Sequence, residues 1–291
     1  MFFVLEFSAS PRLRVSASKG DSVYSGVARE AATVKFCVLA SGSSGNAALL
    51  ATENTRILID AGLSMRELGR RLASIGEDLC NLDAIVITHE HSDHVAGLPV
   101  LARNKNLQAA IYLTWLTEPA IDWGECRPSR LETFQAGSSF PIGDIEVRSF
   151  SVPHDAVDPV GFRLEAEGVR IGMATDLGYI PDSIKFHLRS TDVLLLESNH
   201  DLDMLKVGPY PWSVKQRVMS RVGHLSNLGM AEFLLRDLSA ATAQLVLGHI
   251  SEQNNHPEIV RLMANEALGK RGLDTQLTLA SQRAPTEVFR F

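Results

Sequence analysis

The chain contains few cysteines, and this shortage excludes two kinds of site. Only Cys37, Cys80 and Cys126 occur in the 291 residues, and they are odd in number and widely scattered. A disulfide framework needs paired cysteines, and a thiolate metal site needs cysteines at short, regular spacings. Neither is predicted, and a reducing cytoplasm is the compartment that fits best.

Long apolar runs and an excess of basic residues are also missing. No apolar run reaches the length of a membrane span, so we expect no membrane partner. The chain carries 28 basic and 34 acidic residues, which gives a formal net charge of −6. Because nucleic-acid-binding proteins tend to be basic or to gather a basic patch, this balance argues mildly against a nucleic-acid ligand. It is not decisive, since some carboxylates can belong to a metal site, where bound cations reverse the local field.

The composition indicates one large domain. An apolar fraction of 45% and a charged fraction of 21% are ordinary for a globular protein. Because sandwich and barrel folds often run to about 200 to 250 residues around one core, we expect residues 34–291 to form a single domain. Residues 1–33 are serine-rich and aperiodic, which predicts a flexible extension or a start codon assigned too far upstream. Glu6 interrupts their apolar beginning and no basic residue precedes it, which argues against a signal peptide.

The densest group of metal-binding residue types is a motif of spacing H-x-H-x-D-H. It consists of His89, His91, Asp93 and His94, and it closely follows the apolar run 82–87. Such a run predicts a short buried strand, and a loop at its end can aim several ligands at one point. Imidazole and carboxylate together suit zinc, manganese or iron, whereas calcium and magnesium sites are built mostly from oxygen. The motif therefore predicts a metal site.

Further residues of ligand type stand at the ends of four other strand-like segments. Asp60 follows 57–59, His154 follows 145–152, Asp176 follows 169–175 and His249 follows 245–248. Polar groups at strand ends can converge on one edge of a sheet without burying an unpaired charge in mid-core. Since two imidazoles from one loop do not complete a coordination shell, these residues are the candidates for the remaining ligands.

In this order the motifs resemble the five signature motifs of the metallo-β-lactamase-fold hydrolases, from about Val34 to the end of the chain. The resemblance implies an α/β fold, the αββα four-layer sandwich, with a metal site at one edge of the two sheets. It also implies two divalent ions, zinc or manganese, as cofactors. One ion would be held by His89, His91 and His154, the other by Asp93, His94 and His249, with Asp176 bridging them. Asp60 would orient the histidine loop without binding a metal itself.

Several shorter segments narrow the resemblance to one branch, the YycJ/WalJ exonuclease group. They are 41–46 (SGSSGN), 197–201 (ESNHD), 210–212 (YPW), 223–227 (GHLSN) and 247–255 (LGHISEQNN). Only 72 residues, 177–248, separate Asp176 from His249, which is too few for the large inserted domain of the β-CASP nucleases. The resemblance implies a metal-dependent hydrolase with 5′→3′ exonuclease activity, and hence DNA as the substrate.

For phosphodiester hydrolysis at such a site, several residues have expected roles. Two neighbouring divalent ions activate a bridging hydroxide and clamp the attacking and leaving oxygens. Asp93, the carboxylate within the histidine motif, could accept the proton of the nucleophile as well as bind metal. His224 is the candidate proton donor to the departing sugar oxygen, or a phosphate clamp, and His200 could share that role. Glu197 is expected to hold one of these imidazoles in the right tautomer, and Ser226 to support His224 or touch the substrate.

Two amphipathic segments predict helices with basic faces. Ser64 and Glu67 have capping-box spacing, so a helix should begin just after Ser64 and carry on its outer side Arg66, Arg70 and Arg71. A second helix is predicted over 214–222 from its apolar periodicity. Each basic face would either contact phosphate or be solvated. The loop 41–46 would either approach phosphate through its backbone N–H groups or form a tight hairpin connection.

Three other functions stay open at this point. They are hydrolysis of small or cyclic phosphodiesters, hydrolysis of a thioester or lactone as in the glyoxalase II type, and metal binding by a regulatory protein without catalysis. All the expected ligands are present, which disfavours the last. The residues leave open the physiological metal, the choice between DNA and RNA, the strandedness and polarity of the substrate, and the oligomeric state.

Overall fold

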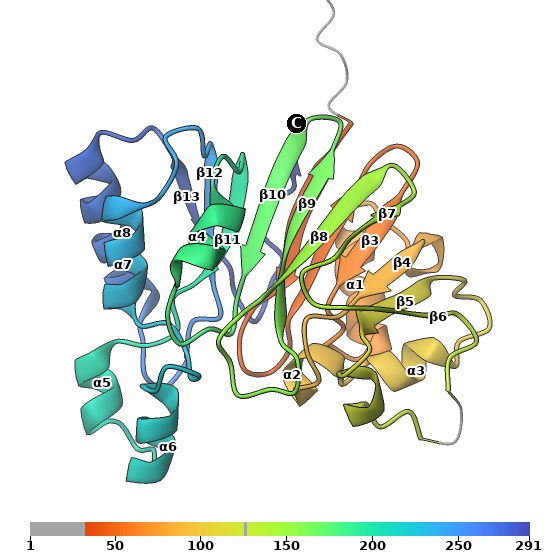
Figure 1. Cartoon of the computed structure of the whole chain (residues 1–291), viewed down its shortest axis with the longest axis horizontal. Helices are drawn as coiled ribbons and strands as arrows, with labels where there is room; N and C mark the ends of the chain where they lie inside the picture. Colours follow the sequence, from red (N-terminus) through yellow and green to blue (C-terminus); the bar gives the residue numbers. More distant parts are fainter. Residues whose placement is uncertain (1–32, 125–126) are drawn as a thin grey trace, which may run out of the picture. The chain divides into compact units, whose positions relative to one another are not determined.

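The structure, a computed structural model, describes residues 33–124 and 127–291. The predicted extension of residues 1–33 therefore lies outside the described residues except for Thr33, and Cys126 lies outside them too. Within the described residues, two mixed β-sheets of seven strands each pack face to face, and helices cover their outer faces (Figure 1). This arrangement confirms the predicted αββα sandwich.

The first sheet has the strand order β14-β1-β2-β3-β4-β5-β6. Its strands, in chain order, are β1 (Lys35–Ala40), β2 (Ala47–Ala51), β3 (Arg56–Ile59), β4 (Ala84–Val86), β5 (Ala110–Thr114), β6 (Leu131–Phe134) and β14 (Phe289–Arg290). The second sheet has the order β13-β12-β11-β10-β9-β8-β7. Its strands are β7 (Ser139–Ile142), β8 (Ile145–Ser151), β9 (Val160–Ala166), β10 (Val169–Ala174), β11 (Val193–Glu197), β12 (Gln244–Gly248) and β13 (Gln276–Leu279).

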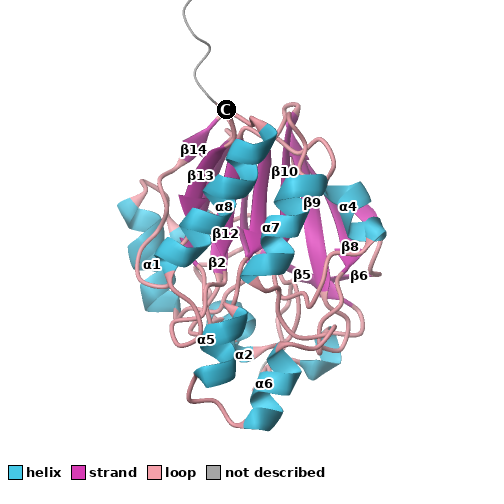
Figure 2. Ribbon diagram, turned by 90° about the vertical axis from the view of Figure 1, so that its left-hand side faces the viewer, coloured by secondary structure: helices cyan, strands magenta, loops and turns pink. Residues whose placement is uncertain are grey.

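The helices divide between the two outer faces and the ends of the strands (Figure 2). Apolar side chains of α1 (Met65–Ser74) and α3 (Leu98–Ala102) pack on the first sheet. Those of α4 (Asp182–Leu188), α7 (Asn227–Arg236) and α8 (Pro257–Arg271) pack on the second. Beyond the strand ends lie α2 (Ser92–Val95), α5 (Leu202–Val207) and α6 (Trp212–Val218), and two short 3₁₀ helices are η1 (Leu79–Asn81) and η2 (Glu118–Ala120). No helix among the described residues combines the length and the apolarity needed to cross a membrane.

The core between the sheets is built by alternating side chains. In β8, Ile145 and Val147 are buried, whereas Glu146 and Arg148 are exposed. This follows because successive side chains of a strand point to opposite faces of the sheet. Every residue of β12 is buried instead, since helices cover the outer face of the second sheet there. Polar side chains are thereby excluded from the middle of the central strands and gather where those strands end.

Strand direction brings several strand ends to a common edge. In the first sheet β3, β4, β5 and β6 are parallel, and in the second β10, β11, β12 and β13 are parallel. Since both β8 and β10 are antiparallel to β9, which lies between them, they run in the same direction. The residues that follow β3 and β4 therefore lie at one edge of the first sheet. Those that follow β8, β10, β11 and β12 lie at one edge of the second.

The helix predicted after Ser64 is α1, and its cap is the predicted one. Ser64 Oγ accepts a hydrogen bond from Glu67 N over 3.3 Å. The prediction that Arg71 lies on the outer side is wrong, because Arg71 is only 5% exposed. Its guanidinium group donates to Leu39 O over 2.7 Å and to Gln282 O over 3.0 Å. Position 71 follows the buried Leu68 by three residues and so lies on the inward face, where the side chain ties α1 to the end of β1.

The helix predicted over 214–222 is displaced towards the N-terminus. The observed helix, α6, begins at Trp212 after Pro211 and ends at Val218. Pro211 sets this start, because a residue that precedes the first helical turn loses nothing by lacking a backbone N–H. The predicted basic face is also divided: Lys215 is buried and donates from Nζ to Lys206 O over 2.8 Å, whereas Arg217 is exposed.

Candidate metal centre

Six of the expected site residues leave the sheets at the common edge. Asp60 follows β3, His89 follows β4, His154 follows β8, Asp176 follows β10, Glu197 ends β11 and His249 follows β12. Asp60, Asp176 and His249 have positive φ angles of 60°, 55° and 53°. Residues other than glycine rarely occupy this left-handed region, and where they do the site is often functional. At each of these positions the chain turns sharply as soon as it leaves the strand, which points its polar side chain into the space between the loops.

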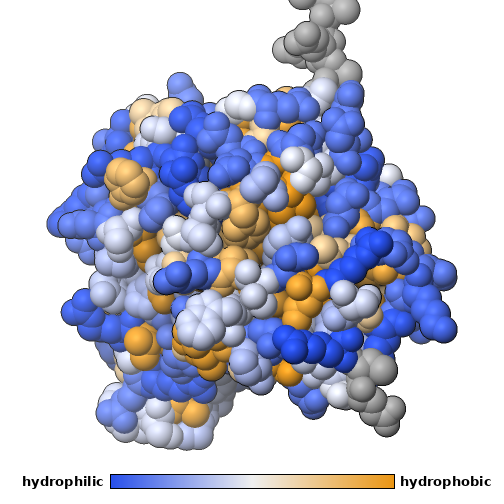
Figure 3. All heavy atoms as spheres, turned by 45° about the vertical axis from the view of Figure 1, so that its right-hand side comes forward, coloured by the Kyte–Doolittle hydropathy of each residue, from blue (hydrophilic) through white to orange (hydrophobic). Residues whose placement is uncertain are grey.

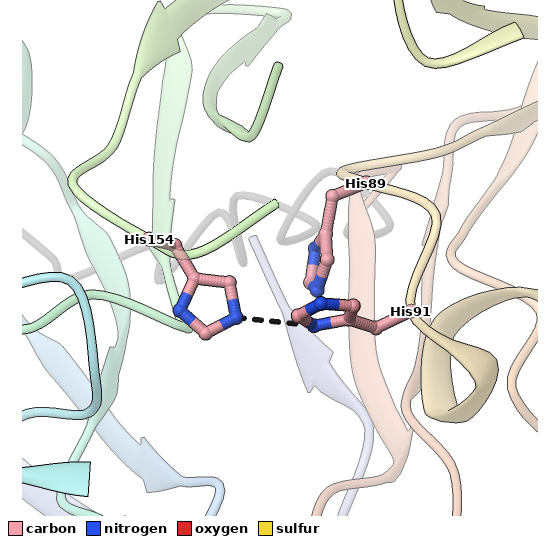
Figure 4. A group of neighbouring side chains, drawn as sticks. All are labelled: His89, His91 and His154. Carbon is pink, nitrogen blue, oxygen red and sulfur yellow. Dashed lines mark hydrogen bonds between the residues drawn. The ribbon is translucent and has the colours of Figure 1, made fainter. Parts of the chain in front are cut away.

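His89, His91 and His154 form the first group of candidate ligands (Figure 4). His154 Nε2 lies 3.2 Å from His91 Nδ1. Tetrahedral zinc with Zn–N bonds of about 2.0–2.1 Å would hold two nitrogens about 3.3–3.4 Å apart, so this spacing suits two ligands of one ion. His89 is 1% exposed, and its Nε2 has no hydrogen-bond partner among the described residues. A buried polar atom without a partner is costly, and a bound ion would remove that cost.

Asp93, His94 and His249 form the second group. Asp93 Oδ2 lies 3.5 Å from His94 Nε2 and 3.4 Å from His249 Nε2. Asp176 stands between the groups: its Oδ2 lies 3.2 Å from His94 Nε2, and its Oδ1 lies 4.0 Å from His154 Nε2. The structure thus brings together all seven residues that were expected to bind metal, from loops of both sheets.

The carboxylates of this centre are ionised. Burial alone would raise the pKa of Asp176, but the positive charges of His249 and His94 outweigh burial and lower the pKa well below its usual range. Burial likewise opposes ionisation of Asp93, and hydrogen bonds with His249 and His94 lower its pKa instead. Anionic oxygens and imidazole nitrogens at such short distances form a donor set for a divalent cation.

Three of the histidines use Nδ1 for a hydrogen bond to a supporting residue and direct Nε2 towards the other candidate ligands. His154 Nδ1 donates to Gly223 O over 3.1 Å, and His94 Nδ1 donates to Asp60 Oδ2 over 2.8 Å. His249 Nδ1 donates to Glu197 Oε1, also over 2.8 Å. Metal-binding histidines are commonly held in this way, because the second hydrogen bond fixes both the tautomer and the ring orientation. Asp60 contacts His94 of the histidine motif, and it lies outside the groups of described residues that could hold an ion.

Glu197 supports two imidazoles at once. It was expected beside His224 or His200, and its Oε1 accepts from Nδ1 of His224 and from Nδ1 of His249, each over 2.8 Å. Its Oε2 accepts from the backbone N–H groups of Leu177 and Leu225 over 3.0 and 3.2 Å. Burial alone would raise its pKa, but the charges and hydrogen bonds of His224 and His249 hold the pKa of Glu197 at about 2.

His224, His200 and Ser226 lie in different surroundings. The ring of His224 is centred 5.1 Å from the rings of both His154 and His249, and its side chain is 22% exposed. His200 is only 1% exposed, and neither of its ring nitrogens has a partner among the described residues. Ser226 caps α7, since its Oγ accepts from Gly229 N over 3.1 Å. Of these three, His224 is the one whose ring is both partly exposed and next to the rings of candidate ligands.

Three supporting residues were not expected from the sequence. Asn46 Nδ2 donates to Asp93 Oδ2 over 3.1 Å, and Asn46 N donates to Asp93 O over 2.7 Å. Ser41 Oγ accepts from His249 N over 2.7 Å, and Thr88 Oγ1 lies 3.0 Å from His89 Nδ1. Ser41 and Asn46 flank the connection between β1 and β2, at the edge of the sheet where Asp60 lies. Their position at the end of one strand and the start of the next could have identified them as neighbours of the ligands.

The loop 41–46 is a tight hairpin connection. Gly42 N donates to Asn46 Oδ1 over 2.9 Å, and Ser44 N donates to Gln282 Oε1 over 2.8 Å. Gly45 N donates to Gly42 O over 3.1 Å. Because these N–H groups are already paired within the protein, of the two expected roles the structure favours the connection over a phosphate cradle.

Comparison with known proteins places the chain among metal-dependent hydrolases. Residues 55–250 match the family model described as "Beta-lactamase superfamily domain". The chain is 40% identical to Exodeoxyribonuclease WalJ of Streptococcus pneumoniae over 235 residues, which are 80% of this chain and 87% of that protein. It is 36% identical to Exodeoxyribonuclease YycJ of Bacillus anthracis over 239 residues, 81% of this chain and 90% of that protein. The metallo-β-lactamase fold protein YhfI of Bacillus subtilis shares the fold, with a TM-score of 0.68 and 17% identity over 89% of this chain and 100% of YhfI.

Proposed function

The chain belongs to the β-lactamase superfamily and is a metal-dependent hydrolase, and we propose that it shortens DNA from the 5′ end at a pair of divalent ions. Its identity with two exodeoxyribonucleases over most of their length supports a metal-dependent nuclease. The observation that carries the finer proposal is the position of Asp176, whose carboxylate lies within 4.0 Å of one histidine from each ligand group. A carboxylate placed in this way could contact both ions of a two-metal phosphodiesterase site.

The residues present fit two ions of zinc or manganese. His89, His91 and His154 would hold one, Asp93, His94 and His249 would hold the other, and Asp176 would contact both. Bound there, the ions would supply an activated water at neutral pH and neutralise negative charge on the phosphodiester. The unpartnered buried atoms His89 Nε2 and Asp176 Oδ2 support this assignment.

Asp93 is the proposed proton acceptor. Its Oδ2 lies close to His94 and His249 and accepts a hydrogen bond from Asn46 Nδ2. Its Oδ1 has no hydrogen bond among the described residues, and the side chain is 20% exposed. Oδ1 is therefore the oxygen available to take the proton of the attacking water.

His224 is the proposed proton donor to the departing sugar oxygen. Its Nδ1 is held by the buried Glu197 carboxylate, which also stabilises the protonated imidazole. Nε2 is then the atom left to face a substrate. A positioned acid of this kind commonly contributes about 10²- to 10⁴-fold to a rate.

The proposal is tested with a panel of substrates and the manganese-loaded full chain. The panel contains 5′-phosphorylated duplex DNA, single-stranded DNA, RNA, a cyclic nucleotide and a thioester. We expect mononucleotides to be released from the 5′ end of DNA, so that a 3′-labelled strand shortens progressively while a 5′ label is lost at once. An Asp176→Asn preparation, purified in the same way, controls for contaminating nucleases.

Two results would move the assignment. Hydrolysis of the thioester with DNA untouched would favour the glyoxalase-type reaction, and cleavage of the cyclic nucleotide alone would favour a small-molecule phosphodiesterase.

Binding to DNA should weaken as salt is raised, because phosphate contacts release counterions.

A further inference from the structure

Three polar side chains are almost completely buried among the loops that carry the candidate site. The face drawn in Figure 3 is mostly hydrophilic, with its apolar side chains in small separate groups. Polar side chains on such a surface are solvated by water, whereas Ser198, Asn227 and Asn255 are 0%, 1% and 4% exposed. Serine and asparagine are seldom buried to this degree, and a buried polar group is costly unless it is paired. Their burial therefore indicates a role for the contacts that they make.

The three side chains form one hydrogen-bonded group, the amide cluster. Asn227 Nδ2 donates to Asn255 Oδ1 over 2.9 Å, and Asn255 Nδ2 donates in return to Asn227 Oδ1 over 2.8 Å. Ser198 Oγ donates to Asn227 Oδ1 over 2.8 Å. Asn255 Nδ2 also donates to the carbonyl oxygens of Ser198 and Asn199, each over 3.0 Å. A buried polar group that is paired in this way specifies one arrangement of the segments that it joins.

Each member of the amide cluster stands in a loop that also carries a residue of the candidate site. The loops are the segments 197–201, 223–227 and 247–255, three of those that narrowed the family resemblance. In chain order, the site residue and the cluster residue of each loop are Glu197 and Ser198, His224 and Asn227, and His249 and Asn255.

Backbone hydrogen bonds place the segment 197–201 between the other two. Ser198 N donates to Gly248 O over 3.0 Å on one side. Asn199 N donates to Leu225 O over 2.8 Å on the other side. The backbones of the two outer segments are therefore separated, and side chains are needed to join them.

The two asparagines make that connection. Among the residues that the structure describes, the only hydrogen bonds that directly join the segments 223–227 and 247–255 are the two between Asn227 and Asn255. The amide pair thus sets the distance between the loop of the proposed proton donor and the loop of a candidate metal ligand.

His224 depends on the position of its loop more than a metal ligand does. Its ring makes one hydrogen bond among the described residues, from Nδ1 to Glu197 Oε1. Because one bond leaves the ring free to turn about it, the place of Nε2 also depends on the backbone of 223–227. Before the ring, His224 N donates to Val218 O over 3.0 Å. After the ring, the side chain of Asn227 holds the loop through the amide cluster.

We propose that Asn227 and Asn255 are positioning residues for His224, and that their amide pair holds its loop where Nε2 reaches the departing sugar oxygen. The inference rests on the proposed role of His224 as proton donor. Both asparagines are buried, so they act through His224 and not by touching the substrate. An amide suits this task because each partner of the pair must donate and accept at once.

The first test is Asn227→Ala in the manganese-loaded full chain. Asn227 begins α7 directly after the Ser226 cap, so alanine removes the amide and leaves the cap in place. We expect kcat on DNA to fall by about 10- to 100-fold with KM changed by less than about twofold, because a small displacement of a catalytic group is costly. On a p-nitrophenyl phosphodiester the loss should stay below about threefold, since that leaving group needs no proton. Asn255→Ala removes the same pair from the other loop and should give the same pattern.

A double variant shows whether the amide pair acts through His224. In a His224→Ala chain, Asn227→Ala should have no further effect on DNA cleavage, because the group that it positions is missing. Elemental analysis should give the same metal content for Asn227→Ala as for the wild type. A clear further loss in the double variant would overturn the inference. So would a missing ion or an equally large loss on both substrates, because the pair would then serve the ligands or the fold alone.

Gln244→Ala is the matched control. Gln244 is also a buried amide, and its Nε2 donates to Thr278 Oγ1 over 2.9 Å, but it begins β12 at the end away from His249. This variant should lower the midpoint of denaturant unfolding much as Asn227→Ala does, and it should leave kcat on both substrates unchanged. An equal fall of kcat on DNA in Gln244→Ala would trace the effect of Asn227→Ala to stability and refute the positioning role.

Nuclear magnetic resonance separates this inference from the proposed function. In the zinc-loaded chain with isotopically labelled histidine, the ring signals of His224 are identified by their absence in His224→Ala. They should shift or broaden in Asn227→Ala and stay unchanged in Gln244→Ala, whether or not DNA is cleaved. Such a change without cleavage of any DNA would overturn the proposed function alone. Cleavage of DNA that needs His224, with kcat and ring signals unaltered in both asparagine variants, would overturn the positioning role alone.

Discussion

Glu197 and His249 are joined by a hydrogen bond of 2.8 Å, in which the imidazole Nδ1 donates to the carboxylate Oε1. The register of the second sheet sets this contact, because Glu197 of β11 pairs with Gly248 of β12, and His249 is the next residue. Since Glu197 is completely buried, the orientation of His249 depends on a carboxylate that no solvent reaches.

Replacing Glu197 with Gln should therefore weaken metal binding more than it changes the fold. The amide group would put an NH₂ either where Oε2 now accepts the N–H groups of Leu177 and Leu225, or where Oε1 now accepts from both His224 and His249. Loss of such a supporting carboxylate commonly costs about 10- to 100-fold in metal affinity. Calorimetric titration of the variant with zinc measures this directly. An unchanged affinity would show that the contact with His249 has no part in metal binding.

His89→Ala and His249→Ala should each lose one ion from a different position. His89 belongs to the group with His91 and His154, whereas His249 belongs to the group with Asp93 and His94. Elemental analysis of dialysed protein should give about two ions per wild-type chain and about one for each variant. Fewer than about one ion per wild-type chain, at saturating manganese or zinc, would rule out the dinuclear centre.

His224→Ala should keep both ions and the fold but slow phosphodiester cleavage by about 10²- to 10⁴-fold. The reason is that His224 lies beside the ligands and donates to Glu197, yet keeps Nε2 free for a substrate. On a p-nitrophenyl phosphodiester the loss should be smaller, because that leaving group departs without a proton. An equally large loss there would make His224 a phosphate clamp, and a missing ion would make it a ligand.

Arg71→Ala should destabilise the protein by about 2 to 4 kcal/mol, because it removes the donors to the buried carbonyl of Leu39 and the partly buried carbonyl of Gln282. Arg70→Ala is the matched control: Arg70 contacts the same Glu67 but is exposed, so its loss should destabilise the protein much less. Denaturant unfolding followed by circular dichroism measures both. Equal losses would show that the buried contacts of Arg71 contribute nothing of their own.

The positions of the candidate ligands could be predicted from the sequence because their signal is local. His89, His154, Asp176 and His249 stand within three residues of a strand, and the strand directions are then fixed by the fold. The other ligands follow His89 within the same motif of spacing H-x-H-x-D-H. The start of α1 was predictable for the same reason, since Ser64 and Glu67 carry the cap between them. The bounds of α6 were missed because Pro211 decided its start and outweighed the apolar periodicity that begins at Val214.

Contacts between distant segments left no such signal. Asn46 and Asp93 are 47 residues apart, and Ser41 and His249 are 208 residues apart, so nothing in either segment alone indicates its partner. The second partner of Glu197 was missed similarly, because it depends on the register between β11 and β12. The burial of Arg71 was missed since an arginine on an amphipathic helix is ordinarily assigned to solvent.

The direction of β10 leaves one turn of the protein far from its metal-bearing edge. Gly168 lies in the turn between β9 and β10, at the start of β10, whereas Asp176 follows the end of that strand. A methyl group on Gly168 would meet no atom within 4 Å, while the turn at Gly143 is closed by Thr55, only 2.0 Å from where its Cβ would stand. Both glycines have positive φ angles, at which a side chain would be strained, so an insertion next to Gly168 that leaves the glycine in place is the better attachment point. A fluorophore or a short tether inserted there would report on the enzyme, or fix it to a surface, with its reactive edge still facing the solution.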